Sequence, residues 1–462
     1  MFTLERLFDP ATGVDSMPFR GIRGAAAFDE ARWKEAASPN GRTAGHPQRW
    51  LEPVALPGVK ALGRHTVQIQ LAKPDPTFLV RLSYGTTAIV PRDYVERVGP
   101  RFATAPIGTG PYVLKDWSRG TRMRFERNVH HFRAGHPGPD GVEVLLNVDR
   151  FTQGILFERG EIDFLCFMTD PDALRFKRDP KLRRLLRIAE ATSPTFIALN
   201  CELPPFTNRL VRQAMNYVVD KEALAKVLLH RGVPALGPLP LVMSGFNQGL
   251  PEYPYDPAKA RALLAEAGFA KGFETTLWTD RDDPTWMNLA LFVQQKLREV
   301  ELTIHLKEVS SPMLLDVSGR RRAVPMSVSD WAAAFDDPKE TLDSLLREKS
   351  ITEEGSMNKA FYANPRVDQL FLATENELDP ARRLQLYHEI EQLVVEDAPW
   401  IFLIHLNTET AYQPCRPQKN GGRTQETVSS LNPWFSAERA VVEPALVIVA
   451  LHPATPRCFA GW

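Results

Sequence analysis

The chain has 462 residues, 44% of them hydrophobic and 24% charged, which is close to the average of globular proteins. This length is typical of two to four domains with sizeable cores. Lys plus Arg and Asp plus Glu number 56 each, so no long-range field favours nucleic acid or an anionic membrane as a partner.

Residues 1–105 combine helical and loop sequence with one clear strand, HTVQIQLA at 65–72. Its apolar residues alternate with two glutamines, which is the period of a strand that buries one face. Residues 34–58 hold several prolines, glycines and polar residues and are predicted to form a surface loop.

The segment 106–127, PIGTGPYVLKDWSRGTRMRFER, predicts two neighbouring strands. Two glycines and a proline form a tight turn before a strand at 112–114, and after a bend at Trp117 a Gly120 turn leads to a second strand at 123–126. GTGPYV opens like a dinucleotide fingerprint but lacks the third glycine, and a strand follows it where a helix is required. A dinucleotide site is therefore excluded here.

Strands and helices alternate from residue 142 onward. VEVLLNV at 142–148 is almost entirely apolar, as in a strand covered on both faces. Asp149 then caps a helix that stops at Gly160, because glycine tolerates the left-handed backbone at a helix end. Farther on, FIALN at 196–200 and IFLIHL at 401–406 are predicted to be buried strands.

Helices in the second half begin at capping residues that precede a helical run, often with Pro at the first helical position. Residues 208–219 are the first of these helices, and the caps of later ones are Asp220, Asp256 and Asp379. We interpret Arg209 and Arg212, in the first of these helices, as surface or interlobe pairings.

Metal chemistry is not predicted. The four cysteines have no zinc-site spacing and are expected to be free thiols: Cys166, Cys201, Cys415 and Cys458. HEIEQ begins like a zinc-protease helix at His388, but Gln392 occupies the place of the second histidine. The histidines of HHFRAGH at 130–136 are expected in a solvated loop.

Several segments in order resemble the family 5 extracellular solute-binding proteins, the receptors of peptide-type ABC importers. Together they span roughly residues 60–412: GTGPY at 108–112, RGEIDFL at 159–165, IALNCELPPFTNRLVRQAMNYVVD at 197–220, YPYDPAKARALLAEAGF at 253–269, FYANPRVDQL at 361–370 and EDAPWIFLIHLN at 396–407. Each segment alone is weak, and their common order makes the resemblance strong.

The resemblance implies an α/β fold of the periplasmic-binding-protein type II, a three-part, two-lobed clamshell with mixed sheets. By it, residues 1–105 are a partial small lobe, 106–196 the middle segment of main lobe I, 197–410 the second ligand-binding lobe, and 411–462 the return toward lobe I with an atypical tail. Because Met1 aligns inside the small lobe, the first strands of the main lobe are expected to be missing. The exposed strand edges this would leave are prone to aggregation.

The resemblance also implies a function. A receptor of this family captures a peptide-like or other small solute between its lobes and delivers it to ABC permease subunits, as a monomer without catalysis or cofactor. Its place is periplasmic or extracellular, although MFTLERLFDPATG contains no export signal. The alternatives are a hydrolase with an interlobe active site, a signalling receptor, or a truncated non-functional remnant.

The candidate ligand-binding residues lie in DWAAAFDDPKETL at 330–342: Trp331, Ala334, Phe335, Asp336 and Asp337. Trp331 and Phe335 would supply apolar walls, with core packing as the alternative for Trp331. Backbone groups of 330–334 would bond an extended ligand as an added strand does. Asp336 and Asp337 either contact the ligand or form a solvated turn.

Within this segment, Ala334 differs from the residue that peptide-binding family members carry at the same position. Peptide-binding members carry an aspartate three residues after the tryptophan, which pairs with the amino terminus of the peptide. Without that partner a buried ammonium is held poorly. We hypothesise that the ligand is not an ordinary zwitterionic di- or tripeptide, and a micromolar affinity for simple dipeptides in calorimetry would refute this.

Overall fold

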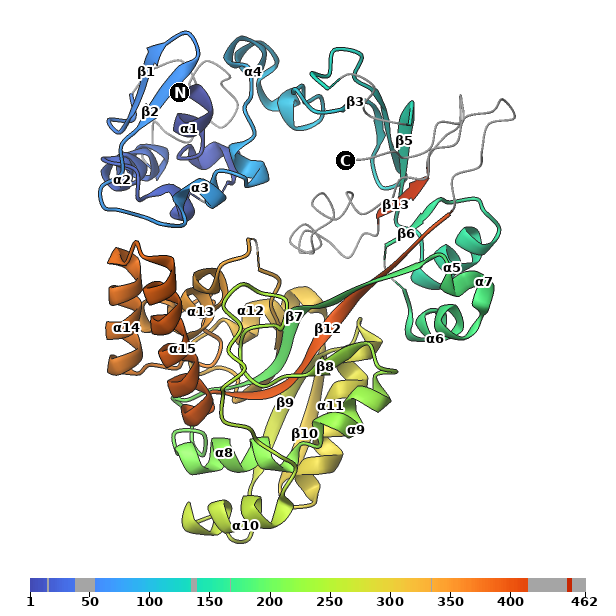
Figure 1. Cartoon of the computed structure of the whole chain (residues 1–462), viewed down its shortest axis with the longest axis vertical. Coiled ribbons are helices and arrows are strands. Elements are labelled where there is room, and N and C mark those ends of the chain that lie inside the picture. Colours follow the sequence, from blue (N-terminus) through green and yellow to red (C-terminus); the bar gives the residue numbers. More distant parts are fainter. Residues whose placement is uncertain are drawn as a thin grey trace. The chain divides into compact units, whose positions relative to one another are not determined.

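The computed structural model describes residues 1–14, 16–37, 55–133, 139–166, 168–333, 335–413 and 447–450. These residues form two compact units (Figure 1). Unit 1 comprises Met1–Leu165 with Tyr412, Gln413 and Val447–Ala450, and unit 2 comprises Cys166–Ala411. The predicted lobe boundaries after residues 105, 196 and 410 stay predictions. No helix in the described ranges has the length and apolarity needed to cross a bilayer.

The first part of unit 1 is a set of short elements around a small apolar core. They are α1 (Phe2–Arg6), η1 (Pro10–Thr12), η2 (Met17–Phe19), α2 (Ala25–Ala37), β1 (Val59–Gly63), β2 (Thr66–Ile69), α3 (Phe78–Arg81), η4 (Gly85–Thr87), α4 (Arg92–Val98) and η5 (Gly99–Ala103). Phe8, Phe19 and Ile22 are at most 1% exposed in this core. The strand predicted at 65–72 is β2, but its buried face is wrong at Val67, which is 50% exposed, because only from Ile69 does the strand pack against the core.

The second part of unit 1 is an antiparallel sheet in the order β6-β13-β5-β4-β3. Its elements are β3 (Tyr112–Ser118), β4 (Arg122–Arg127), β5 (Gly141–Leu146), α5 (Arg150–Glu158), β6 (Phe164–Leu165) and β13 (Val447–Ala450). The predicted strand pair is confirmed as β3 and β4, with φ of 73° at Gly120. The Asp149 cap and the Gly160 stop of α5 are confirmed as well.

Unit 2 is built on a mixed sheet in the order β10-β9-β11-β7-β12, with β8 beside β12. Its strands are β7 (Leu186–Leu199), β8 (Gly232–Pro234), β9 (Glu274–Asp280), β10 (Thr303–Val309), β11 (Met326–Asp330) and β12 (Trp400–Tyr412). β9 is parallel to both β10 and β11, whereas β7 is antiparallel to β11 and β12.

Four of the helices of unit 2 start where the sequence predicted them. The helices of this unit are α6 (Asp170–Arg178), α7 (Pro180–Arg183), α8 (Arg209–Val218), α9 (Lys221–Val227), α10 (Pro257–Glu266), α11 (Pro284–Arg298), α12 (Ser311–Ser318), α13 (Pro338–Leu346), η6 (Glu348–Ser350), α14 (Pro365–Asn376) and α15 (Pro380–Asp397). The three predicted caps each accept a backbone N–H of their own first turn: Asp220, Asp256 and Asp379. Asn208 caps the helix predicted at 208–219 in the same way. Short polar caps thus locate helix starts from sequence alone.

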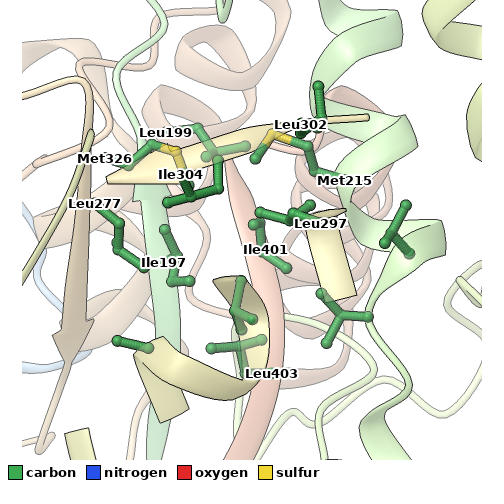
Figure 2. Packing of buried hydrophobic residues seen from close by; sticks show 14 of the residues in the cluster. Ile197, Leu199, Met215, Leu277, Leu297, Leu302, Ile304, Met326, Ile401 and Leu403 are labelled. Atoms are coloured by element: carbon green, nitrogen blue, oxygen red, sulfur yellow. The ribbon is translucent and has the colours of Figure 1, made fainter. Parts of the chain in front are cut away.

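Helices cover both faces of the unit 2 sheet. On one face Ile197, Leu199 and Met326 pack against residues of α8, α10 and α11 (Figure 2). On the other, Phe196 and Phe402 pack against α13, α14 and α15. Because side chains of a strand alternate between faces, β7 contributes successive residues to both cores and holds the two layers together.

Candidate ligand-binding site

The predicted site segment follows β11 at the carboxyl edge of the parallel strands in unit 2. β9 ends at Asp280 and its parallel neighbour β11 ends at Asp330, with α11 and α12 starting shortly after β9 and β10. In open α/β sheets, ligands bind beyond the carboxyl ends of the strands. Residues 331–333 and 335–337 therefore lie where a sheet of this kind places a ligand.

Trp331 is held firmly at this edge. Its indole Nε1–H donates to Glu340 Oε2 at 2.8 Å, and its backbone N–H donates to Pro194 O at 3.2 Å. The Ser193 hydroxyl donates to the Trp331 carbonyl at 2.8 Å. The half-buried ring packs partly against the Phe196 core, so one residue combines core packing with an accessible surface.

Ala334 lies outside the described residues, and its neighbours on the C-terminal side differ in exposure. Phe335 is half-buried, whereas Asp336 is exposed. The Ser244 backbone N–H and hydroxyl donate to the two Asp336 oxygens at 2.7 and 2.5 Å. Asp336 thus fixes the loop to Ser244 while its side chain stays open to solvent.

Asp337 is engaged within the protein. It caps α13 by accepting the Lys339 N–H at 2.9 Å. Arg383 of α15 donates to both of its oxygens, at 2.8 and 2.6 Å, in the bidentate geometry that makes such pairs strong. The carboxylate therefore ties the end of the site loop to two helices, and its predicted ligand contact stays a prediction.

Two charged groups near this loop were not predicted from the sequence. Asp330 is the last residue of β11, and Lys359 lies in the connection before α14. Burial raises the pKa of Asp330 to about 6, a shift that Lys359 opposes and Asp283 reinforces. Burial lowers the pKa of Lys359 to about 8, a shift that Asp330 opposes. The position of Asp330 directly before Trp331 was a sequence signal that could have pointed to this carboxylate. No sequence signal pointed to Lys359.

Arg212 corrects the interpretation of two arginines as surface or interlobe pairings. Its side chain is only 6% exposed, and it donates to Phe206 O at 2.7 Å and to Asp397 O at 2.9 Å within unit 2. The Asp397 carbonyl lies at the C-terminal end of α15, where carbonyls need donors from outside the helix, and a guanidinium supplies several donors in fixed geometry. Arg209 does lie at the surface, 3.6 Å from Asp397.

The remaining candidate metal residues have other contacts. His388 Nε2 lies 3.1 Å from the Gly245 carbonyl, to which it donates as the protonated ring nitrogen. Cys166 and Cys201 are free thiols whose pKa values burial raises to about 12 and about 11. Cys415, Cys458 and His136 lie outside the described residues. Within the described ranges, no group of three His, Cys, Asp or Glu is arranged to hold a metal ion.

Unit 2 has a mixed sheet covered by helices on both faces, and a hydrogen-bonded loop lies at the carboxyl edge of this sheet. This is the architecture of an α/β solute-binding protein of the periplasmic-binding-protein type. Residues 1–353 match the bacterial extracellular solute-binding proteins, family 5 Middle, and the chain belongs to this family. The predicted family, fold class and solute-binding function are thereby confirmed. Family members are extracellular binding proteins.

Sequence and structural relatives agree with this assignment. Glutathione-binding protein GsiB of Pectobacterium atrosepticum is 30% identical over 347 residues, which cover 73% of this chain and 66% of the relative. Clavulanic acid biosynthesis oligopeptide binding protein 2 has a TM-score of 0.76 at 24% identity, covering 90% of this chain and 75% of that one. The Helicobacter pylori periplasmic binding protein DppA, in complex with peptide STSA, has a TM-score of 0.66 at 23% identity over 77% of this chain and 69% of that one.

Proposed function

We propose that this protein is the receptor of an ABC importer that binds a glutathione-like peptide and releases it unchanged to a membrane permease. The strongest support is the loop formed by residues 331–333 and 335–337, which hydrogen bonds to Glu340 and from Ser244 and Arg383 hold at the carboxyl edge of the sheet. Such preorganisation lowers the entropic cost of binding. Trp331 and Phe335 then supply the apolar walls, with Asp336 at the rim.

The ligand class follows from two observations. The relative at 30% identity is named a glutathione-binding protein. Ala334 removes the carboxylate that would pair with the amino terminus of an ordinary peptide. In glutathione the first residue is linked through its side chain, so its ammonium and a free carboxylate sit on one carbon. A γ-linked peptide therefore needs a different anchor from an α-linked one.

Calorimetry with a matched pair of peptides tests this proposal. The purified protein is titrated with γ-Glu-Cys-Gly and with its isomer α-Glu-Cys-Gly, which has the same composition and net charge. We expect a micromolar dissociation constant for the γ isomer and affinity at least about tenfold weaker for the α isomer, as for a lost charged contact. Equal affinity for both, or micromolar binding of dialanine, would overturn the ligand class.

The proposal also covers the absence of turnover, the location of the protein in the cell, its oligomeric state and its partners. After overnight incubation, mass spectrometry is expected to recover the peptide intact, whereas a hydrolase would yield Cys-Gly or free glutamate. The protein is proposed to act as a monomer outside the cytoplasm, beside ABC permease subunits. Sedimentation of the liganded protein and co-purification with a permease test these two points separately.

A further inference from the structure

An irregular segment of unit 2, residues 235–246, lies in the chain between β8 and α10 and is called the strap below. It contains no helix or strand, yet much of it is buried. Leu239 and Met243 are 0% and 8% exposed and belong to the same core as Phe196. Buried backbone groups need hydrogen-bond partners, so a segment of this kind depends on side chains from elsewhere in the fold.

Two side chains hold the beginning of the strap. Lys221, the first residue of α9, donates through Nζ to Ala235 O at 2.7 Å. The buried His405 of β12 donates through Nε2 to Gly237 O at 3.2 Å, because a carbonyl can only accept. The strap is therefore fixed to α9 and to the central part of the sheet before it reaches the site.

The end of the strap packs on α13 and α15. His388 of α15 donates through Nε2 to Gly245 O at 3.1 Å. Gly245 has a φ of 104°, a conformation that favours glycine. A Cβ atom at Gly245 would lie 2.5 Å from Pro338 Cγ and 3.0 Å from Leu384 Cδ1. The strap backbone thus touches the first residue of α13 directly, and a larger residue does not fit there.

The strap meets the site loop, residues 331–333 and 335–337, at this same end. The Ser244 backbone N–H and hydroxyl donate to the two Asp336 oxygens at 2.7 and 2.5 Å. Gly245 packs on Pro338, so the strap contacts the chain on both sides of Asp337. Ser244 and Asp336 are 92 positions apart in the sequence, and only the folded unit brings them together.

We propose that the strap positions the site loop for the solute, with Ser244, Gly245 and His388 as positioning residues that act through Asp336 and Pro338. This inference rests on the proposed function and adds a segment outside residues 330–342 to the binding apparatus. A weakened strap lowers the fraction of molecules whose loop is in the binding position, and the apparent affinity falls with that fraction. A bound solute holds the loop itself, so the strap governs association and not dissociation.

Stopped-flow kinetics with glutathione test the assignment through two pairs of variants. Ser244→Ala removes the hydroxyl and Ser244→Thr keeps one, whereas His388→Leu removes the donor and His388→Gln keeps an N–H. Ser244→Ala and His388→Leu are each expected to lower the association rate constant about fivefold to tenfold, with the dissociation rate constant within about twofold of wild type. Ser244→Thr and His388→Gln should restore association. The control is His305→Leu, which removes a 61% exposed histidine of β10 and should bind as wild type does.

Hydrogen exchange of the loop amides provides a readout without ligand. In the free protein, residues 335–337 are expected to exchange faster in Ser244→Ala and His388→Leu than in wild type, and saturating glutathione should remove the difference. Unchanged association and exchange in both variants would overturn this inference and leave the proposed function standing. Faster dissociation with unchanged association would also overturn it, because the residues would then contact the solute. Failure of the wild type to bind any γ-glutamyl peptide would overturn the proposed function, and exchange in the free protein would still decide whether the strap holds the loop.

Discussion

Two single residues, Asp330 and Lys359, are expected to link ligand binding to pH through their protonation. Asp330 has a pKa of about 6, and Lys359 has a pKa of about 8. Between these values Asp330 is mainly an anion and Lys359 mainly a cation. The window in which both groups are charged is therefore centred near neutral pH.

Ligand affinity is expected to follow that window. Below about pH 6, binding must first remove a proton from Asp330, and above about pH 8 it must add one to Lys359, so affinity falls on both sides. Asp283 is the other charge facing Asp330. Titrations with S-methylglutathione, which has no thiol to ionise, measure this from pH 4.5 to 9. A flat profile would contradict this expectation, whereas Asp330→Asn should abolish only the acid limb.

Glu391 of α15 gives a separate expectation for stability. It is 0% exposed, both carboxyl oxygens lack a side-chain partner in the described chain, and burial raises its pKa well above the ordinary value. A raised carboxyl pKa means that the folded state keeps a proton which the unfolded state has released. The free energy of unfolding therefore falls as pH rises above the unfolded pKa, by up to about 1.4 kcal/mol per unit.

Glu391→Gln should remove this dependence. The variant is expected to be at least about 1 kcal/mol more stable than wild type at pH 8 and little changed at pH 4. Urea unfolding at both pH values measures the difference. The neighbouring Glu389→Gln, on the exposed part of the same helix, is the control and should show no such change (its side chain is 55% exposed). A pH-independent effect of Glu391→Gln would contradict the mechanism.

At the scale of elements, helix ends and the connections they anchor determine the geometry of the site. Asp337 is at once the cap of α13 and the partner of Arg383 in α15. The loop 331–337 therefore enters one helix and is tied to another. Asn358 holds the connection that carries Lys359, since its side-chain amide donates hydrogen bonds to the backbone carbonyls of Arg347 and Tyr362.

Arg383→Met is expected to loosen the site loop. The Arg383 and Asp337 side chains are 12% and 14% exposed, so removing the guanidinium leaves a poorly solvated carboxylate and costs about 3 kcal/mol of stability. Arg382→Met is the matched control, because its side chain is 74% exposed and should matter by less than about 0.5 kcal/mol. Chemical unfolding of both variants measures the difference. Equal losses would show that the Asp337 pair does not hold the loop.

At the scale of the whole molecule, the two units allow ligand binding to be assigned to one of them. All residues of the proposed site lie in unit 2, Cys166–Ala411. A ligand that binds only the folded unit stabilises it by about 2.7 kcal/mol at 100 times its dissociation constant. For a unit of this size that corresponds to a rise in melting temperature of about 5–10 °C.

Calorimetric melting with glutathione is expected to shift the transition of unit 2. If unit 1 melts in a separate transition, that transition should stay in place. A single combined transition calls for limited proteolysis, in which glutathione should protect cleavage sites in residues 166–411. Protection confined to residues 1–133 would place the ligand in unit 1 and contradict the proposed site.

The sequence by itself determined the features that depend on neighbouring residues. Asp before a helical run, twice with Pro next, placed the starts of α9, α10 and α15, because a cap satisfies backbone groups within its own turn. The segments that resemble the family follow one another in the family's order between residues 60 and 412, and they likewise identified the family and its fold. The site loop beginning at Trp331 was found through the same resemblance.

Only the tertiary structure decided what depends on residues far apart in the chain. β7 spans 14 residues where the sequence indicated five, because its polar first half becomes a strand only by pairing with β12. Arg212 is buried because carbonyls of Phe206 and Asp397 converge on it, and no local pattern announces that. The charge of Lys359 acts on the pKa of Asp330 from 29 positions away in the sequence, which no local pattern announces.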